Sequence, residues 1–575
     1  MNGLTNKQWN LPPHTPQEFI DQMAAWKAHP VIAQILYRRG FTDPAQAAEL
    51  FSIYGKDDNP FSLKGMTEAV YRLRMAIRNH EPIAIYGDFD CDGVCSTVVL
   101  TQALQKLGAV VRPYIPSRVD EGYGLNSPAL KNLAGEGVKV VVTVDCGIRS
   151  VQEVIDGTSY GLDMIISDHH SIGPEIPPAL AVINPKQVDC TYPEKMLAGV
   201  GLAYKIAQGL YMEAQRRKFK TDGWHPNDWL DLVAMGTVAD IAPLLGENRM
   251  LVQEGLKRLN APERPGLKAL YGVAGVKTGR VSAVTIGFLL GPRINAAGRL
   301  RSALLAYNLL CEGEMSQAVR QAEELNALNQ ERQQKTETMQ GWAEEQMEEG
   351  RVEPLLFAAD ERFEQGVVGL VASRLTETYY RPSVVVQIGH EESHGSCRSI
   401  PEFHITHALD QCSDLLERFG GHAAAAGFTV RNERIGQLKA RLLEIADGEL
   451  AGQALLPSLD IDAELPLSQA TLETADALAG LEPTGEANRT PIFMARDLSL
   501  VEQRTVGSDG RHLKLTLSDG VTRMEAIAFR LGELAGKIPE RIDVAYNLEA
   551  DEWNDQRRLQ LNVRDLRPAA GLFEG

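Results

Sequence analysis

Long apolar runs are missing from this chain of 575 residues. No run reaches the roughly 18 consecutive apolar residues from which a membrane span is built, so we expect no membrane segment. Residues 1–13 contain polar side chains and prolines where a secretory signal would have an apolar centre. These two absences predict a cytoplasmic protein.

Cysteines are few and show no pairing pattern. The seven cysteines are scattered along the chain, and no pair of Cys-x-x-Cys motifs is present. Reduced thiols are therefore the economical interpretation. The weaker alternative is that Cys91 and Cys95 form half of a zinc site.

An excess of basic residues is also missing. The chain has 58 Lys and Arg against 76 Asp and Glu, and the net charge of −18 argues against a surface covered with nucleic-acid-binding groups. One basic channel can coexist with an acidic exterior, so a nuclease is not excluded. The length, with 44% apolar and 23% charged residues, is typical of three or four soluble domains.

The acidic stretch YGDFDCDG at residues 86–93 organises the rest of the chain. An apolar run at 82–86 predicts a buried strand, and helical spacing at 94–107 predicts a helix after the glycine. Between them lie Asp88, Asp90 and Asp92. Their carboxylates repel one another unless cations lie among them. A solvated acidic turn is the alternative for this stretch alone.

The same construction recurs downstream. Strands are predicted at 109–115, 138–144 and 164–167, with helices at 96–107, 126–134 and 150–156, and this alternation is typical of a parallel doubly wound sheet. Asp145 follows the third strand, and Asp168, His169 and His170 follow the fourth. Because ligands of such sheets gather at the carboxyl ends of the strands, we expect these side chains to lie together.

A further carboxylate, Asp240, ends an apolar helix predicted at 229–238. A buried Asp needs a cation or several donors, and helix capping is the alternative. The candidate metal ligands are then Asp88, Asp90, Asp92, Asp145, His169, His170 and Asp240, with Asp168 orienting one imidazole. Mixed oxygen and nitrogen ligands suit two manganese ions, with magnesium as the alternative, and indicate hydrolysis of a phosphate ester or anhydride.

Phosphate-binding candidates occur in the second half. Arg293, Asn295 and Arg299 lie among small residues at 291–299, where a salt-bridged helix start is the alternative.

A long amphipathic helix at 314–349 is predicted to join two lobes, with its charges facing solvent. In the second lobe we expect strands at 354–359 and 383–387 and a helix at 367–379. A small-residue loop at 395–399 follows, with Ser396 and Arg398, and then a helix beginning near Gly421 and His422, where a packed histidine is the alternative.

From about residue 456 the pattern changes to short strands. They are predicted at 460–463, 493–500, 512–517, 524–529, 542–549 and 559–565, which suggests a small barrel of the OB type. His512, Lys514, Arg523 and Trp553 form a modest basic and aromatic surface for single strands, and a purely structural barrel is the alternative.

With these residues assembled, the sequence resembles the DHH phosphoesterase superfamily. The motifs that carry the resemblance are YGDFDCDG (86–93), IPSRVDEGYGL (115–125), VTVDCG (142–147), SDHH (167–170), LAGVGLAYK (197–205), VADIAPL (238–244), GPRINAAGRL (291–300), VVGLVASRL (367–375), GSCRS (395–399) and FGGHAAAAGF (419–428). Within this superfamily the match is close to the single-stranded-DNA-specific exonucleases. They imply an α/β architecture of five parts: an N-terminal helical region (1–75), a DHH catalytic domain (76–312), a connecting helix (313–350), a DHH-associated substrate-binding domain (351–455) and an OB-fold domain (456–575).

The resemblance also implies an activity, namely 5′-to-3′ release of mononucleotides from single-stranded DNA by two-metal-ion hydrolysis, in DNA repair and recombination. It implies that Asp90, Asp92, Asp145, His169, His170 and Asp240 bind metal, with Asp88 in the same motif. Ser396, Arg398 and Gly421 would hold the 5′-phosphate, with Arg374 and Arg118 along the strand and His422 stabilising charge.

Several further expectations accompany this resemblance. We expect a monomer with a single-strand-binding protein and a helicase as partners. A phosphodiesterase of short oligonucleotides, a pyrophosphatase and an inactive DNA-binding scaffold are the alternative functions.

Overall fold

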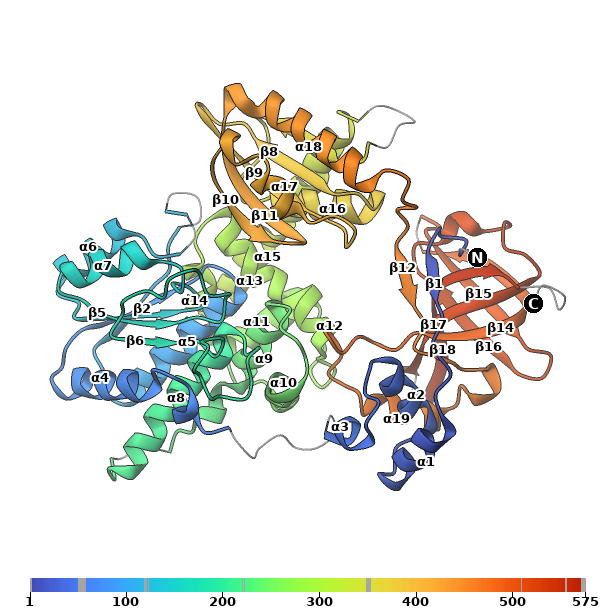
Figure 1. Ribbon diagram of the computed structural model, residues 1–575. Coiled ribbons are helices and arrows are strands. Elements are labelled where there is room, and N and C mark those ends of the chain that lie inside the picture. The colour runs from blue at the N-terminus through green and yellow to red at the C-terminus, as the bar shows by residue number, and fades with distance from the viewer. Residues whose placement is uncertain are drawn as a thin grey trace. The chain divides into compact units, whose positions relative to one another are not determined.

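The computed structural model describes residues 3–49, 58–117, 121–122, 124–219, 221, 223–347, 353–507, 509–553 and 556–569 (Figure 1). The chain forms two compact units. One comprises Met1–Tyr54, Leu456–Thr484 and Asn488–Gly575, and the other comprises Gly55–Leu455 with Gly485–Ala487. The N-terminal helices therefore share a unit with the C-terminal strands. Among the described residues, no helix has the length and apolar character needed to cross a bilayer.

The first domain of the larger unit is built on a five-stranded parallel sheet in the order β3-β2-β4-β5-β6. Its strands are β2 (Ile83–Gly87), β3 (Val111–Tyr114), β4 (Val140–Val144), β5 (Asp163–Ser167) and β6 (Ala181–Ile183). The order reverses between β2 and β4, and in doubly wound sheets this switch point is where ligands bind. The sheet thus places the acidic motif, which follows β2, at the expected position.

Helices cover both faces of this sheet. Alternate residues of β2 point to opposite faces: Ile83 and Ile85 pack with α4, α5 and α8, whereas Ala84 and Tyr86 pack with α6 and α7. These helices are α4 (Met66–Arg78), α5 (Cys91–Lys106), α6 (Ser127–Gly135), α7 (Val151–Ser159) and α8 (Gly199–Arg216). The predicted doubly wound architecture is confirmed.

The helix after the acidic motif begins earlier than predicted. It starts at Cys91, because Asp90 caps it by accepting a hydrogen bond from the backbone N–H of Gly93 at 3.0 Å. Asp92 therefore lies in the first helical turn, and not in a preceding loop.

More helices complete the domain and lead to the second lobe. They are α9 (Leu230–Ala239), α10 (Gly246–Leu259), α11 (Pro265–Ala274), α12 (Ala283–Thr285), the π-helical turn η3 (Ile286–Leu290), α13 (Gly291–Leu300), α14 (Leu304–Cys311) and α15 (Met315–Glu344). The segment 291–299 is thus helical, and α15 is the predicted connecting helix in 30 residues.

The second lobe carries a mixed sheet in the order β10-β11-β9-β8-β7. Its elements are β7 (Leu356–Asp360), α16 (Val368–Tyr379), β8 (Ser383–Gln387), β9 (Glu392–Arg398), α17 (Ile405–Asp410), β10 (Leu416–His422), β11 (Ala425–Arg431) and α18 (Ile435–Leu450).

Two predictions in this lobe were wrong. The expected loop at 395–399 is largely strand β9, whose Gly395 makes room for the ring of Phe428 on β11. The expected helix after His422 is a hairpin in which His422 pairs with Ala425. The four alanines favour a helix locally, but pairing with β9 and β10 overrides that preference.

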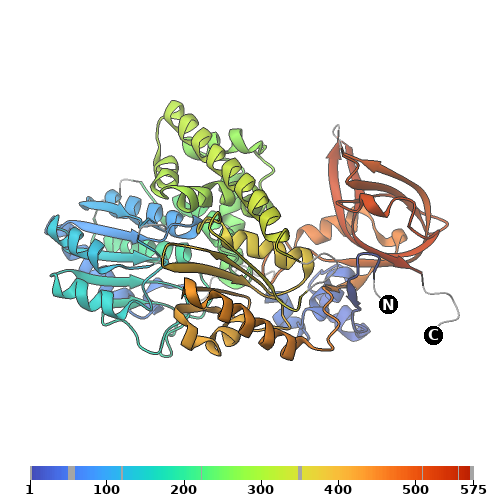
Figure 2. The ribbon, with the colours of Figure 1, turned by 90° about the horizontal axis from the view of Figure 1, so that it is seen from above.

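The smaller unit contains a closed barrel. β14 (Phe493–Val506), β15 (His512–Ser518), β16 (Arg523–Ala528), β18 (Gln556–Pro568) and β17 (Arg541–Trp553) follow one another, and pairing of β14 with β17 closes the ring, as Figure 2 shows. The barrel shares its apolar core with the N-terminal helices. The other elements are α1 (Gln17–Ala25), α2 (Pro30–Arg38), α3 (Pro44–Glu49), α19 (Leu472–Ala479), β13 (Ala463–Glu464) and the pair β1 (Gln8–Asn10) and β12 (Ser458–Asp460).

Candidate metal centre

Seven predicted ligands lie together at the carboxyl edge of the parallel sheet. They fall into three groups whose ligand atoms lie within 4.8 Å of one another: Asp145 with His169 and His170, Asp92 with His169 and Asp240, and Asp88 with Asp90 and Asp145. Because Asp145 and His169 each belong to two groups, the three groups form one continuous cluster. An arrangement of this size has room for more than one cation.

Asp145 is held in an unusual backbone conformation at the end of β4. Its φ of 64° lies in the left-handed region, which costs free energy for a residue with a side chain. A Cβ added to Gly199 would lie 2.6 Å from the Cβ of Asp145, so the start of α8 approaches this carboxylate closely. Sequence reasoning missed Gly199, whose only signal was its place in the motif LAGVGLAYK.

Asp92 binds the N-terminus of α8. Its two carboxylate oxygens accept hydrogen bonds from the backbone N–H groups of Gly199 and Val200, at 2.7 and 2.8 Å. The helix dipole favours a negative charge at this position. A Cβ on Gly236 would lie 2.7 Å from Asp92 Oδ1, so α9 also requires a glycine here.

The contact between His169 and Asp145 fits a bound cation. Nε2 of His169 lies 3.1 Å from Oδ1 of Asp145 and 3.7 Å from Oδ2 of Asp240. The Nε2 and Asp145 Oδ1 atoms are buried, and neither has a hydrogen-bond partner. Burial and the neighbouring His170 lower the pKa of His169 to about 3, so its imidazole is neutral. A buried imidazole nitrogen and a buried carboxylate oxygen that face each other without a hydrogen bond fit a shared cation.

Asp168 orients His170. Its Oδ1 lies 2.7 Å from Nδ1 of His170 and accepts the backbone N–H of the same residue at 3.0 Å, while Oδ2 accepts the N–H of Ile148 at 2.9 Å. Burial opposes the charge on His170, but these contacts with Asp168 outweigh it and raise the pKa of His170. Nδ1 of His170 also lies 4.0 Å from Oδ1 of Asp145, so Asp168 fixes the orientation of this ring beside the cluster.

Without a cation, the carboxyl groups of the cluster ionise less readily than ordinary carboxyl groups. Burial, followed by the neighbouring carboxylates, raises the pKa of Asp92 to about 7 and that of Asp240 to about 9. The same causes raise the pKa of Asp145 well above its ordinary value. A divalent cation reverses this penalty, so the donor set fits a metal centre.

The predicted phosphate-binding residues of α13 occupy distinct positions. The Asn295 side-chain oxygen accepts the backbone N–H of Cys91 at 2.6 Å and so braces the start of α5. Arg293 donates to Asn326 of α15 at 3.0 Å, and Arg299 donates to the carbonyl of Gly366 at 3.2 Å. The helix therefore links the acidic motif to the second lobe.

In the second lobe, Ser396 and Arg398 lie side by side on β9, with Nη1 of Arg398 3.4 Å from Oγ of Ser396. A Cβ on Gly369 would lie 3.0 Å from that Oγ, so the pair adjoins the first turn of α16. Gly421 and His422 are exposed at the end of β10. Arg374 of α16 donates to Gln340 of α15. Arg118 lies outside the described residues.

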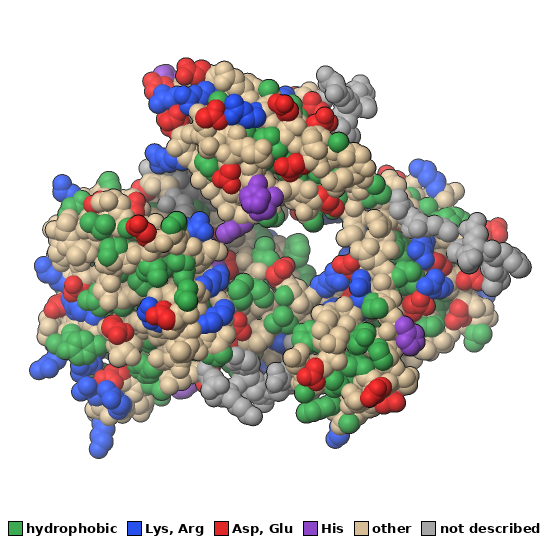
Figure 3. All heavy atoms as spheres, in the orientation of Figure 1, with side chains coloured by type: hydrophobic (Ala, Val, Ile, Leu, Met, Phe, Trp, Pro, Cys, Tyr) green, Lys and Arg blue, Asp and Glu red, His purple; other side chains and the backbone are tan. Residues whose placement is uncertain are grey.

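On the barrel, the predicted single-strand surface is partly paired within the unit. Lys514 forms an ion pair with Glu525 at 2.9 Å, and Nδ1 of His512 accepts the backbone N–H of Arg530 at 3.0 Å. Arg523 is exposed on β16, and the side chain of Trp553 lies outside the described part of the chain. On the face drawn in Figure 3, basic and acidic side chains are interspersed, without one continuous basic area.

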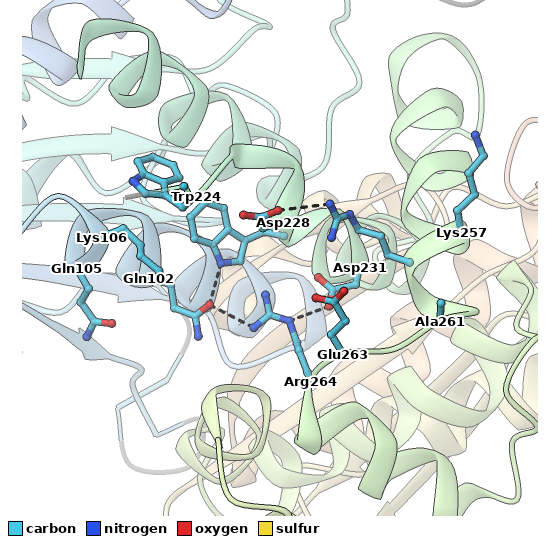
Figure 4. Close-up of a pocket in the computed structure, with 13 residues that line it drawn as sticks. Gln102, Gln105, Lys106, Trp224, Asp228, Asp231, Lys257, Ala261, Glu263 and Arg264 are labelled. Atoms are coloured by element: carbon cyan, nitrogen blue, oxygen red, sulfur yellow. Dashed lines mark hydrogen bonds and ion pairs between the residues drawn. The ribbon is translucent and has the colours of Figure 1, made fainter. Parts of the chain in front are cut away.

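One cavity lies elsewhere in the domain that carries the candidate metal centre. It has a volume of about 1010 Å³, and none of the seven candidate ligands lines it. Figure 4 shows its polar groups paired with one another: Trp229 donates to Gln102 at 2.8 Å, and Arg264 donates to Asp231 at 2.7 Å. This cavity therefore does not coincide with the candidate metal centre.

Three family models match the chain: the DHH family N-terminal domain at residues 82–237, the DHHA1 domain at 353–451 and the RecJ OB domain at 461–565. The single-stranded-DNA-specific exonuclease RecJ of Bacillus subtilis is 39% identical over 93% of this chain and 68% of its own length.

Two crystal structures of RecJ from Thermus thermophilus are also similar. The complex with Mn²⁺ has a TM-score of 0.82 and 31% identity, covering 99% of this chain and 80% of that one. The complex with Mg²⁺ has a TM-score of 0.78 and 30% identity, covering 98% and 79%. The resemblance predicted from the motifs is confirmed, and the chain belongs to the RecJ family of the DHH phosphoesterases.

Proposed function

We propose that this protein is a metal-dependent exonuclease that degrades single-stranded DNA from the 5′ end and releases 5′-mononucleotides. The observation that carries the proposal is the cluster of five carboxylates and two imidazoles with buried, unpaired ligand atoms at one sheet edge. The relative from Bacillus subtilis is named a single-stranded-DNA-specific exonuclease, which supports the same substrate here. Neither the phosphodiesterase of short oligonucleotides, the pyrophosphatase nor the scaffold is favoured by that relative.

Two divalent cations are the cofactor in this proposal, manganese first and magnesium as the alternative. The imidazole nitrogens of His169 and His170 suit manganese, and the carboxylates suit either ion. RecJ of Thermus thermophilus is described in complex with Mn²⁺ and in complex with Mg²⁺. When bound, the pair supplies Lewis acidity and an activated water for attack at phosphorus.

The residues of the chain have distinct tasks in this proposal. Asp88, Asp90, Asp92, Asp145, His169, His170 and Asp240 hold the cations, and Asp168 fixes the orientation of the His170 ring. Ser396 and Arg398, beside the first turn of α16, bind the 5′-phosphate with charge-assisted hydrogen bonds. His422 is exposed in the hairpin of β10 and β11, where its partner Ala425 pairs with Arg398. It stabilises charge on the scissile phosphate.

Finer expectations belong to the same proposal. The protein acts as a monomer in the cytoplasm, in DNA repair and recombination, after a helicase has exposed single strands bound by a single-strand-binding protein. The helicase step follows from the substrate, because a nuclease confined to single strands requires their supply.

The experiment is digestion of 5′-phosphorylated single-stranded DNA with manganese, magnesium or chelator. Label at the 5′ end is expected to appear in mononucleotides at once, whereas label at the 3′ end stays in long products until late. Matched duplex, a dinucleotide and pyrophosphate serve as comparison substrates. Cleavage confined to the dinucleotide or pyrophosphate would contradict the proposal, as would unchanged cleavage in chelator.

A further inference from the structure

The two histidines of the candidate metal centre lie just beyond the paired part of β5. Strand β6 runs beside β5 at the edge of the parallel sheet, and the pairing ends at Ser167 and Ile183 (Figure 1). The backbone N–H of Asp168 still donates to the carbonyl of Ile183 at 3.1 Å. The carbonyls of His169 and His170 lie past this ladder, so they need hydrogen-bond donors from elsewhere in the fold.

Both carbonyls are held by side chains of the segment that follows β6. The Lys186 ammonium donates to the carbonyl of His169 at 2.6 Å, and the Asn184 amide donates to the carbonyl of His170 at 3.0 Å. Side chains thus continue the attachment of β6 to β5 through the two residues that carry the imidazoles. Both hydrogen bonds act on the backbone from which the rings project.

The segment 184–187 is itself fixed in place. The side-chain oxygen of Asn184 accepts the backbone N–H of Lys186 at 2.9 Å, and the Gln187 amide donates to the carbonyl of Val182, also at 2.9 Å. Asn184 and Gln187 are buried, and Lys186 is half-buried. A buried and internally bonded segment presents its donors in one direction, because its conformational entropy is already lost on folding.

His169 depends on this support more than His170 does. Asp168 holds the His170 ring through Nδ1 at 2.7 Å, which is the usual way of orienting a metal-binding histidine. Nε2 of His169 faces Asp145 at 3.1 Å and has no hydrogen-bond partner. The position of this ring therefore depends on its backbone, which Lys186 holds.

We infer that Asn184 and Lys186 are positioning residues of the metal centre, which hold His169 and His170 in place for the cations. The inference rests on the proposed function, because it concerns the same cations. Groups that bind a ligand must be held to within about 0.5 Å of the productive geometry, so the loss of a backbone support has a measurable effect on affinity.

Lys186 allows a sharp test because positioning and charge predict opposite results. Its ammonium is a cation beside a ligand of the proposed metal ions, and like charges repel. If charge alone mattered, removing the ammonium would strengthen metal binding. If Lys186 positions His169, removing it weakens metal binding.

The test measures binding of manganese to the full chain without DNA, by electron paramagnetic resonance of the free ion. Lys186→Met is compared with Lys186→Arg, which keeps both the charge and the donors. Lys195→Met is the matched control. Lys195 is also half-buried and donates to a backbone carbonyl, that of Cys190, at 2.7 Å, and neither of these two residues is a candidate ligand.

We expect Lys186→Met to weaken manganese binding about tenfold, as for other groups that orient a metal ligand. Cleavage of single strands should then require about tenfold more manganese and should approach the unmodified rate at saturation. Lys186→Arg should retain most of the affinity, and Lys195→Met should match the unmodified protein. Asn184→Ala removes a buried donor and should weaken binding at least as much as Lys186→Met, with thermal unfolding in chelator as the check that it is folded.

Three results would overturn the inference. Manganese binding that is unchanged in Lys186→Met would remove the positioning role, and tighter binding would leave the residue a purely electrostatic effect. An equal loss in Lys195→Met would show that any lost lysine contact in this domain weakens the site. If the unmodified protein bound no manganese, the proposed function itself would fail, and the unmodified protein in the same titration separates that outcome from the other three.

Discussion

Two groups of buried charges in the larger unit differ in how they are compensated. Lys205 of α8 pairs with Glu247 of α10 at 2.5 Å, and Tyr192 donates to the other oxygen of Glu247, also at 2.5 Å. At the sheet edge, in contrast, carboxylates face carboxylates and an unpaired imidazole nitrogen. The charges of the first group are paired within the fold. The second group requires a cation from outside the chain.

This contrast shows how buried charges that stabilise the fold differ from buried charges that bind a ligand. Both groups are buried and both perturb pKa values, since burial raises the pKa of Glu247 as it does that of Asp92. A perturbed pKa alone therefore does not mark a site. The mark is a set of ligand atoms that face one another without an opposite charge such as the one that Lys205 supplies to Glu247.

The largest effect is expected for Asp145→Ala. The variant loses a ligand shared by two groups of the cluster, and the rate of single-strand cleavage should fall at least about a thousandfold. Its melting temperature in chelator should stay the same or rise, because an uncompensated buried carboxylate is removed.

The control for this variant is Asp156→Ala, an Asp of α7 that contacts Ser127 and Gln152 and lies outside the cluster. It should cleave at the normal rate. Substantial cleavage by correctly folded Asp145→Ala would contradict the assigned role.

The opposite pattern is expected for Lys205→Met. Removing one partner of a buried pair leaves Glu247 uncompensated, which should lower the free energy of unfolding by about 3–5 kcal/mol. At a temperature where the variant is folded, its cleavage rate should be near normal. Chemical denaturation gives the first quantity and a nuclease assay the second.

The double variant Lys205→Met/Glu247→Leu sharpens this comparison. It removes both charges and should recover most of the lost stability. If the double variant were as unstable as the single one, the pair would not be the cause.

Much of the catalytic sheet was predictable because its signals are local. β-branched runs such as the one before Asp145 form buried strands, and the residue after each strand necessarily lies at the ligand-binding edge. Most of the metal cluster therefore followed from strand ends, and Asp240 followed from the end of an apolar helix. Its role as the metal site remains a prediction.

What sequence reasoning missed depends on contacts between distant residues. The alanines after His422 form a hairpin because β9 offers a partner strand. Gly199 and Gly236 matter only because α8 and α9 approach Asp145 and Asp92. Arg332 was expected among solvent-facing charges of a long helix, whereas the packing of α13 and α16 half-buries it.

A smaller effect is expected for Asp168→Asn. The variant keeps the shape of the side chain but removes the negative charge that raises the pKa of His170. Metal affinity or cleavage should fall about 10- to 100-fold, as for other partners of metal-binding histidines. A titration with manganese distinguishes the cause: excess manganese should restore much of the rate, whereas a direct catalytic role for Asp168 would leave the rate low at saturation.

The smallest expected effect is a pH dependence of the free energy of unfolding. In chelator, Asp240 holds its proton to about pH 9 in the folded state, whereas an unfolded Asp loses it near pH 4. The folded state therefore binds more protons between pH 7 and pH 9, and stability should fall as pH rises, by on the order of 1 kcal/mol per pH unit. His169 does not contribute in this window, because its pKa of about 3 leaves it neutral in both states above pH 7.

Saturating magnesium keeps the carboxylates ionised and should flatten the pH dependence of stability. Asp240→Asn should reduce that pH dependence in chelator. A melting temperature in chelator that rose from pH 7 to pH 9 would mean that the cluster is compensated within the fold, as Lys205 and Glu247 are.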